Sequence, residues 1–471
     1  MRTLTKDTVN KIGESVTLLG WVHVRRDHGK LIFIDLRDRW GIVQVVFSPA
    51  RKELLASANQ LRSEWVVEIR GTVKKRPKNM ENPVLATGLI EVEADGLNIL
   101  NESKTPPFAL DTDGYEIGEE NRLHYRYLDL RRERLKNDLV VRDKVIAYMR
   151  DFLHKNNFIE IETPILTKST PEGARDYVVP SRIYPGKFYA LPQSPQQYKQ
   201  LLMVAGIERY FQIARCFRDE DTRGDRQPEF TQLDIEMSFT DREEILAMTE
   251  KLYLSLVRTL FPDKRLTLEA DGRIPVMTYK EAMEKYGTDK PDVRKDKNDK
   301  DELAFLFVVD FPAFEWKETE RRWDATHHPF TKPRVENVEM FWKEFKERPG
   351  EMLADQYDFV LNGYEIGGGS IRIHDPELLK AVFEALGNAP EAVERQFGHM
   401  LEAFRYGVPP HGGIAPGIDR LVMILQNEPN IREVIAFPKT GDGRDLMMDA
   451  PSEIDKKQLK ELHITIEAKP L

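Results

Sequence analysis

Hydrophobic and polar residues nearly alternate in five short runs within the first hundred residues, which is the pattern of half-buried β-strands. Gly-containing turn signals separate the runs, and a helical stretch at 52–61 lies between the third and the fourth. The five runs are residues 16–24, 31–36, 42–47, 64–73 and 89–99. Five strands with one helix in this position predict a closed OB-fold barrel over residues 1–104, a fold whose outer face binds oligonucleotides.

The remainder of the chain shows both helical and strand periodicity. Residues 139–155 and 242–260 are amphipathic at helical spacing. Residues 158–166 alternate instead and include Pro164, which suits the end or edge of a strand, where a second subunit could pack. The polar residues 105–135, which begin Thr-Pro-Pro, predict a linker or hinge between two domains.

A charged hairpin is predicted at residues 207–239, where an apolar run and an alternating run flank a polar, Gly-containing loop. Three arginines are interleaved with five carboxylates in this loop; the arginines are Arg218, Arg223 and Arg226. Guanidinium groups beside carboxylates can hold a polyphosphate together with its metal ion. A solvated charged hairpin is the alternative, and for a single arginine it would be the better interpretation.

Two further segments carry candidate chemistry. Residues 357–374 predict two strands around an Asn-Gly turn, and their three consecutive glycines would let a flat ligand lie against the backbone. Asp358 and Glu365 in this segment could face one site as oxygen ligands of Mg²⁺. Residues 409–425 predict a strand or loop that enters a helix, with Gly417 at the turn and Arg420 in the first helical turn.

Other polar clusters are less specific. Residues 191–203 place Gln193, Ser194, Gln196 and Lys199 at the mouth of a short apolar helix. The paired histidines His327 and His328 are more typical of a loop cap than of a metal site, because no third ligand stands at a familiar spacing. Residues 289–302 are highly charged and predict an exposed linker without chemistry.

Composition limits the class of protein. The 471 residues are 41% hydrophobic and 32% charged, which predicts a globular protein of two or three domains. One cysteine, Cys216, excludes an internal disulfide framework and a cysteine-based zinc site. No apolar run approaches 18 residues, so we expect a cytoplasmic protein without a membrane span or secretory signal.

The formal net charge of −9 gives no overall nucleic-acid signature, so any RNA contact must come from local basic patches. One such patch surrounds Phe33 on the first hairpin; it consists of Arg25, Arg26, Lys30, Arg37 and Arg39. Cations beside an aromatic ring suit an unstacked base. The alternative is that Phe33 belongs to the core and the basic residues form a solvated edge, and composition does not decide between the two.

Taken together, the run ending at Pro164, the 207–239 hairpin and the 409–425 helix resemble motifs one, two and three of the class II aminoacyl-tRNA synthetases. The segments TPEGARDYVVP, QSPQQYKQLL, HHPFT and GYEIGGGSIRIH narrow the resemblance to the bacterial type of aspartyl-tRNA synthetase. It covers almost the whole chain. It implies an α/β (α+β) fold in which residues 136–471 form a catalytic domain built on an antiparallel β-sheet flanked by helices.

The resemblance implies a two-step reaction, in which ATP and aspartate form aspartyl-adenylate and the aspartyl group then passes to the 3′-terminal adenosine of tRNA(Asp). Arg218 would bind the α-phosphate and the substrate carboxylate, and Arg420 the γ-phosphate, as the catalytic pair. Mg²⁺ would be held by Asp358 and Glu365. The other residues implied at the ATP site are Asp219, Glu220, Gln227, Glu365, Gly417, Ile418 and Asp419.

Recognition of the other substrates is implied in the same way. Lys199 and Arg372 would bind the side-chain carboxylate of aspartate. The remaining residues implied around aspartate are Glu172, Gln196, Arg218, Asp234, His327 and His328. The residues implied to read the anticodon are Arg26, His28, Phe33 and Gln44. The family also implies a homodimer formed through motif one.

The chain departs from the family pattern at two places. Residues 289–303 stand where bacterial members carry a large insertion domain between motifs two and three, so the insertion is expected to be absent. His28 stands where enzymes strict for tRNA(Asp) often have leucine, and it favours charging of both tRNA(Asp) and tRNA(Asn).

Three alternatives remain at this stage. The first is an enzyme strictly specific for tRNA(Asp). The second is a non-catalytic RNA-binding paralogue, which predicts erosion at Arg218, Glu220, Arg372 or Arg420, yet all four are present. The third is an asparaginyl or lysyl relative, which would not need two cations for its substrate side chain.

Overall fold

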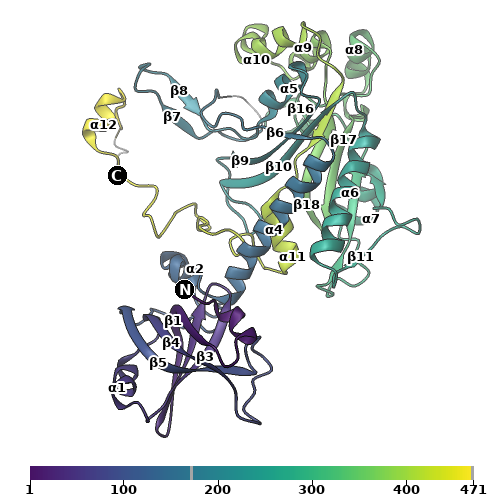
Figure 1. Cartoon of the computed structure of the whole chain (residues 1–471). Coiled ribbons are helices and arrows are strands. Elements are labelled where there is room, and N and C mark those ends of the chain that lie inside the picture. The colour runs from purple at the N-terminus through teal and green to yellow at the C-terminus, as the bar shows by residue number, and fades with distance from the viewer. Residues whose placement is uncertain (170–172, 468–471) are drawn as a thin grey trace. The chain divides into compact units, whose positions relative to one another are not determined.

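The computed structural model describes residues 1–169 and 173–467 (Figure 1). The chain divides into two compact units. The first comprises residues 1–118 and 127–132, and the second comprises residues 119–126 and 133–471. Among the described residues, we find no helix with both the length and the apolar character that crossing a membrane requires.

The first unit is a closed barrel with strand order β1-β2-β3-β5-β4. Its elements are the 3₁₀-helix η1 (Thr5–Asn10), β1 (Ser15–His28), β2 (Leu31–Asp38), β3 (Gly41–Phe47), α1 (Lys52–Gln60), β4 (Val66–Lys75) and β5 (Ile90–Asn101). Alternate side chains of β1, such as Val16, Leu18 and Val22, are buried inside the barrel, as the period of two requires. The predicted five-stranded OB barrel is confirmed.

The second unit is organised on an eight-stranded sheet with the order β12-β14-β17-β18-β19-β10-β9-β6. Its strands are β6 (Ile159–Glu160), β9 (Arg209–Phe217), β10 (Glu229–Ser238), β12 (Val276–Thr278), β14 (Phe305–Val309), β17 (Gln356–Leu361), β18 (Tyr364–Ile371) and β19 (His411–Ile414). One parallel pair stands at each edge, and the pairs between them are antiparallel. The predicted antiparallel sheet flanked by helices is confirmed.

Three helices pack together with β10 around the larger hydrophobic core and cover one face of the sheet (Figure 1). They are α4 (Glu133–Lys155), α6 (Arg242–Leu260) and α11 (Ile418–Gln426). A second core gathers α8 (Val338–Glu347), α9 (Pro376–Ala385) and α10 (Pro390–Phe404). The helix predicted from residue 139 begins earlier, at Glu133, because its first turns are charged and carry little apolar periodicity.

The remaining elements are short. They are α2 (Glu119–His124), α3 (Arg126–Asp129), β7 (Val178–Pro180), β8 (Phe188–Ala190), α5 (Gln196–Val204), β11 (Arg265–Leu266), α7 (Tyr279–Tyr286), β13 (Glu302–Leu303), β15 (Phe314–Lys317), β16 (Arg322–Ala325), η2 (Pro349–Glu351) and α12 (Lys456–Glu461).

The charged segment 289–302 is exposed in its middle, at residues 295–298, but specific contacts hold other parts of it. Glu302 is only 6% exposed, and its carboxylate accepts hydrogen bonds from the backbone N–H of Lys295 at 2.9 Å and of Asp296 at 3.2 Å. Asp292 and Arg294 form a half-buried ion pair at 2.7 Å. The charges therefore satisfy one another and the backbone locally, which composition alone could not reveal.

Candidate active site

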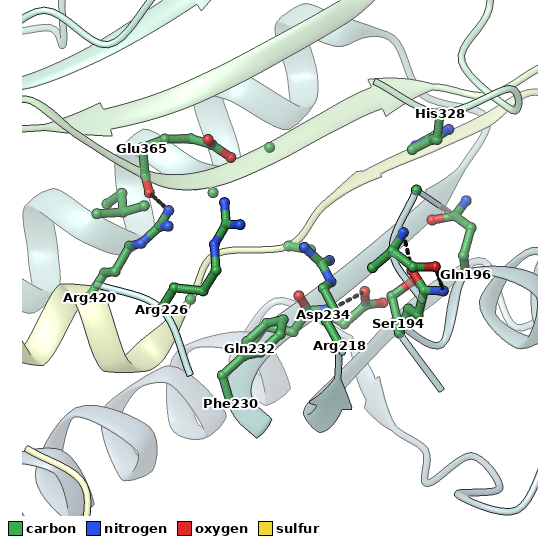
Figure 2. Close-up of a pocket in the computed structure, with 18 of the residues that line it drawn as sticks. Ser194, Gln196, Arg218, Arg226, Phe230, Gln232, Asp234, His328, Glu365 and Arg420 are labelled. Carbon is green, nitrogen blue, oxygen red and sulfur yellow. Dashed lines mark hydrogen bonds between the residues drawn. The ribbon is translucent and has the colours of Figure 1, made fainter. Parts of the chain in front are cut away.

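A cavity of about 390 Å³ lies in the second unit, between segments that are far apart in the sequence (Figure 2). Each predicted motif of this unit except the first contributes to its wall. The lining comes from residues 173–174, 193–199, 218–234, 327–330, 365–372 and 415–420, together with Ile431. The fold thus brings the charged hairpin, the Gly-rich strand and the start of α11 to one site.

A fully buried cluster of charges forms the floor of one end of the cavity. Lys199 Nζ lies 2.9 Å from Asp234 Oδ2 and 3.2 Å from Glu236 Oε2. Arg372 makes a two-pronged contact with Glu236, with Nε to Oε1 at 2.9 Å and Nη2 to Oε2 at 3.1 Å. None of these four side chains is more than 2% exposed. Lys199 and Arg372, predicted as a pair, are held together by one carboxylate.

Sequence reasoning missed that carboxylate. Glu236 follows Asp234 by two residues on β10, and residues two apart in a strand point to the same face. Gln232, Asp234 and Glu236 form a polar row at this period, alternating with the apolar Leu233, Ile235 and Met237. A row of buried polar residues at strand spacing was therefore the signal that could have found it.

The cluster is polarised towards binding an anion. Burial opposes ionisation of Glu236, but the charges of Arg372 and Lys199 outweigh burial and hold its pKa at about 2. Burial raises the pKa of Asp234 despite the ion pair with Lys199. The second oxygen of Asp234, Oδ1, is buried without a hydrogen-bond partner among the described residues. Two cations thus share one firmly ionised carboxylate, which leaves them able to attract a further negative group.

The paired histidines line the cavity instead of only capping a loop. Burial, together with the charges of Arg372 and Arg218, lowers the pKa of His327 to about 3. His328 accepts a hydrogen bond at its Nε2 from Arg372 Nη1 at 2.8 Å, and burial also depresses its pKa. Both rings are therefore neutral and orient neighbouring groups without adding charge.

Two further guanidinium groups line the cavity. The Arg218 guanidinium stacks over the ring of Phe230, with 5.0 Å between its carbon and the ring centroid. In the part of the chain that the structure describes, it forms no ion pair. Arg420 donates to the Glu365 carbonyl at 2.5 Å and to the Asp225 carbonyl at 3.1 Å (Figure 2). Two cations, one directly after β9 and one on α11, meet at one polar cavity and suit a phosphate-bearing ligand.

The two predicted metal ligands lie on neighbouring strands. Asp358 on β17 is 8% exposed, and its Oδ1 has no hydrogen-bond partner among the described residues. Burial and the nearby charge of Glu365 raise the pKa of Asp358. Glu365 lines the cavity. Within residues 1–169 and 173–467, no group of three or more potential ligands is present, so protein alone does not complete a metal site here.

Two carboxylates and an unpartnered buried oxygen nevertheless fit Mg²⁺. This ion keeps several waters and is commonly held by one or two carboxylates together with substrate phosphates.

Several predicted ATP-site residues do not present their side chains to the cavity. Asp219 lies beside Arg175, with 3.4 Å between the charged groups, and Ile418 is fully buried in the core. Asp419 lines the cavity, but its carboxylate is engaged by Arg142 at 2.5 Å and by the Thr231 N–H at 3.0 Å. Strand and helix geometry explains these positions, because neighbouring residues of a motif point in different directions.

Of the other predicted site residues, four line the cavity and one lies outside the described part of the chain. Glu220, Gln227, Gln196 and Gly417 line the cavity. Glu172 lies outside the described residues.

Three of the four predicted anticodon residues gather on the outside of the barrel. Strand pairing places Arg26 opposite Phe33, and Gln44 opposite Asp35, the second residue after Phe33. Arg26 Nη2 lies 2.7 Å from Asp35 Oδ1 and 3.4 Å from Gln44 Oε1. Phe33 is half-buried and stands outside the barrel core, so the alternative that it is a core residue is wrong.

His28 is exposed at the end of β1. Arg37, in contrast, does not belong to the basic patch. It is 5% exposed, and its guanidinium binds Glu64 at 2.7 Å. Strand alternation places Arg37 on the same face of β2 as Phe33, four residues away. The buried carboxylate of Glu64, from a distant loop, removes its charge from the patch.

Two families match the chain. The family of tRNA synthetases class II (D, K and N) matches residues 118–441, which is more than half of the chain. The OB-fold nucleic acid binding domain matches residues 16–100.

Similar proteins cover nearly the whole length. The Aspartate--tRNA(Asp/Asn) ligase of Rubrobacter xylanophilus is 45% identical over 97% of this chain and 95% of its own. The ligase of the same name from Bacillus subtilis is 43% identical over 98% of both. The first alignment extends over 580 residues, more than the 471 residues of this chain, so that relative contains a stretch without a counterpart here.

Solved structures share the architecture. The asparaginyl-tRNA synthetase from Pyrococcus horikoshii, complexed with asparaginyl-adenylate, has a TM-score of 0.74 at 24% identity, with 93% of this chain and 98% of that one covered. The aspartyl-tRNA synthetase from Entamoeba histolytica has a TM-score of 0.71 at 23% identity, with 93% and 91% covered. At this identity the likeness concerns the fold.

Proposed function

Since this chain belongs to the class II tRNA synthetases of the D, K and N group, we propose that it ligates L-aspartate to tRNA with cleavage of ATP to AMP and pyrophosphate. The observation that carries the proposal is the buried pair of Lys199 and Arg372, which share the carboxylate of Glu236 at one end of the cavity. The guanidinium of Arg218, which forms no ion pair with any residue that the structure describes, lines the same cavity. Together they provide a place for a second carboxylate beside a place for phosphates.

Lys199 and Arg372 select the substrate side chain. An aspartate carboxylate completes their charge balance, whereas the neutral amide of asparagine would leave two buried cations undercompensated. Polar matching of this kind discriminates between substrates by roughly 10⁴ or more. The same argument excludes lysine, whose ammonium would be repelled.

The first chemical step requires no nucleophile from the protein. The α-carboxylate of aspartate attacks the α-phosphorus of ATP, and pyrophosphate leaves. Arg218, whose guanidinium lies over the ring of Phe230, neutralises charge that develops on the α-phosphate. Arg420, anchored by the carbonyls of Glu365 and Asp225, holds the terminal phosphate. Catalysis therefore consists of positioning and charge neutralisation.

The chain also has a place for the metal ion that phosphoryl chemistry uses. Asp358 and Glu365 would hold Mg²⁺, and the ion would neutralise phosphate charge. The unpartnered Oδ1 of Asp358 supports this assignment.

Amino-acid-dependent ATP–pyrophosphate exchange tests the proposed function most directly. We expect exchange with aspartate and a rate at least about 10⁴-fold lower with each of the other nineteen amino acids. Faster exchange with asparagine or lysine would reassign the substrate. No exchange with any amino acid would favour the RNA-binding paralogue.

We further propose that the barrel binds the anticodon of tRNA, with Phe33 stacking on one base. Replacing Phe33 by alanine is expected to raise the Kd for tRNA(Asp) about 5- to 100-fold, because stacking on an aromatic ring contributes roughly 1–3 kcal/mol per base. Aspartate-dependent exchange, which needs no tRNA, should keep its wild-type rate. Filter binding and exchange assays measure the two effects, and an unchanged Kd would contradict the assignment.

His28 supports a relaxed choice of tRNA, in which both tRNA(Asp) and tRNA(Asn) are charged. It is exposed at the end of β1, on the hairpin that carries Phe33. Replacing His28 by leucine is expected to lower charging of tRNA(Asn) about tenfold, the effect of roughly 1.4 kcal/mol, with charging of tRNA(Asp) retained. Purified tRNA transcripts provide the measurement. Failure of the wild-type enzyme to charge tRNA(Asn), at levels that fully charge tRNA(Asp), would show that it is strict.

Two features concern the assembly of the enzyme. We propose that the stretch present in the relatives and missing here is the insertion domain, at residues 289–303.

We also propose a homodimer formed through the edge strand β6, beside which Ile159, Ile165 and Leu166 are about half exposed. Sedimentation velocity at micromolar concentration should find a dimer, and a monomer would disprove this interface.

A further inference from the structure

A line of three buried side chains leads from β19 to the aspartate end of the cavity. His411 Nδ1 lies 2.8 Å from the carbonyl oxygen of Pro409, and its Nε2 lies 3.0 Å from Gln200 Nε2. Gln200 Oε1 accepts a hydrogen bond from Gln196 Nε2 at 3.1 Å. His411 and Gln200 are 0% exposed, and neither lines the cavity. Gln196 is 6% exposed and does line it (Figure 2).

The donor and acceptor roles along this line of hydrogen bonds are determined at its buried end, at His411. A carbonyl oxygen can only accept, so His411 Nδ1 must carry the hydrogen that is donated to Pro409. Burial lowers the pKa of His411 to about 4. Among the groups around it, Glu236 favours the protonated ring, whereas Arg372 and His374 oppose it. The ring is therefore neutral near pH 7, and its Nε2 is an acceptor.

Each glutamine amide then has one orientation. Gln200 must donate its NH₂ to His411 Nε2, which leaves its oxygen facing Gln196. Gln196 must in turn donate its NH₂ to that oxygen, one helical turn away on α5. Its own oxygen, Oε1, receives no hydrogen bond from the described residues. That oxygen is left to accept from a ligand in the cavity.

We propose that His411 and Gln200 are positioning residues that hold the Gln196 carboxamide with its oxygen towards the α-ammonium group of aspartate. Asp234 Oδ1, buried and without a partner, is a second acceptor at this end of the cavity. If the Gln196 amide were reversed, its NH₂ would face a cationic group, and the buried hydrogen bond to Gln200 would be lost. The inference rests on the proposed function, because it assumes that aspartate is the occupant.

Two variants at Gln200 distinguish the effect of its hydrogen bonds on aspartate binding from the effect of its packing. Gln200→Met keeps the length of the side chain and removes both hydrogen bonds. We expect it to raise the KM for aspartate about 10- to 100-fold, the usual effect of losing a hydrogen bond to a charged group. Gln200→Glu keeps an acceptor facing Gln196, while its charge is matched by protonation of His411. Its KM for aspartate should remain within about threefold of wild type.

Succinate, which is aspartate without the amino group, provides the diagnostic readout. Its inhibition constant in ATP–pyrophosphate exchange, and the KM for ATP, should be unchanged in Gln200→Met. A parallel weakening of succinate and aspartate would show that Gln200 only maintains packing and would overturn the proposal. An unchanged KM for aspartate in Gln200→Met would overturn it as well.

The folding of the variants and the proposed function, on which this inference rests, are tested separately. Tm is measured for each variant. If Gln200→Met does not fold, His411→Leu removes the same acceptor from the far end of the line and should show the same selective loss of aspartate binding. Wild-type protein without aspartate-dependent exchange would instead reject the proposed function itself.

Discussion

Replacing Arg372 by leucine is expected to lower kcat/KM for aspartate by about a thousandfold, equivalent to roughly 4 kcal/mol. Arg372 is 2% exposed and makes two hydrogen bonds to Glu236. Its removal leaves Lys199 as the remaining cation of the pair, opposite Asp234 and Glu236. An incoming aspartate carboxylate would then meet a cluster whose net charge is less positive by one unit. The measurement is aspartate-dependent ATP–pyrophosphate exchange.

The same variant should also lose selectivity. One cation suits a neutral amide better than two cations do. Arg372→Leu should therefore lose more activity with aspartate than with asparagine, so the ratio of kcat/KM for aspartate over asparagine is expected to fall. Arg334→Leu is the matched control. Arg334, like Arg372, is bound to carboxylate, here Asp310 and Asp355 at 2.5 and 2.7 Å, but it is only partly buried and does not line the cavity. If both variants lose activity equally, the effect of Arg372 is on folding.

Replacing Arg218 by alanine is expected to reduce kcat of exchange about 100- to 1000-fold, the range found when one donor to a transition-state anion is removed. The guanidinium stacks on Phe230 and forms no ion pair among the described residues. Its removal therefore leaves no buried carboxylate unpaired, and Tm should change little. This combination of large kinetic loss and small stability loss distinguishes Arg218 from Arg372.

Arg215→Ala is the neighbouring control. Arg215 lies on β9, which Arg218 directly follows, but its guanidinium binds Glu229 at 2.7 Å, and the residue does not line the cavity. Exchange should remain near the wild-type rate in this variant. Wild-type kcat in Arg218→Ala would contradict the role of Arg218 at the α-phosphate and would leave Arg420 as the phosphate-binding arginine.

Local patterns in the sequence determined the elements and much of the site. Alternation identified the barrel strands, and the hairpin of β9 and β10 followed from two runs around a polar loop. Asn362 and Gly363 form the predicted turn, with φ of 51° and 85°, because Asn and Gly tolerate the left-handed region. These features depend on residues that are near one another along the chain, so the periods of two and 3.6 reveal them.

Only the tertiary structure decided which charges pair. Glu236 joins Lys199 to Arg372 across three elements, Glu64 buries Arg37, and His411 sets the orientation of Gln196 through Gln200. Each of these arrangements includes a contact between residues distant in the sequence, and each depends on burial, which makes an unpaired charge or amide costly. A sequence indicates that such groups are present. Their partners follow from the packing of strands and helices that the local pattern does not specify.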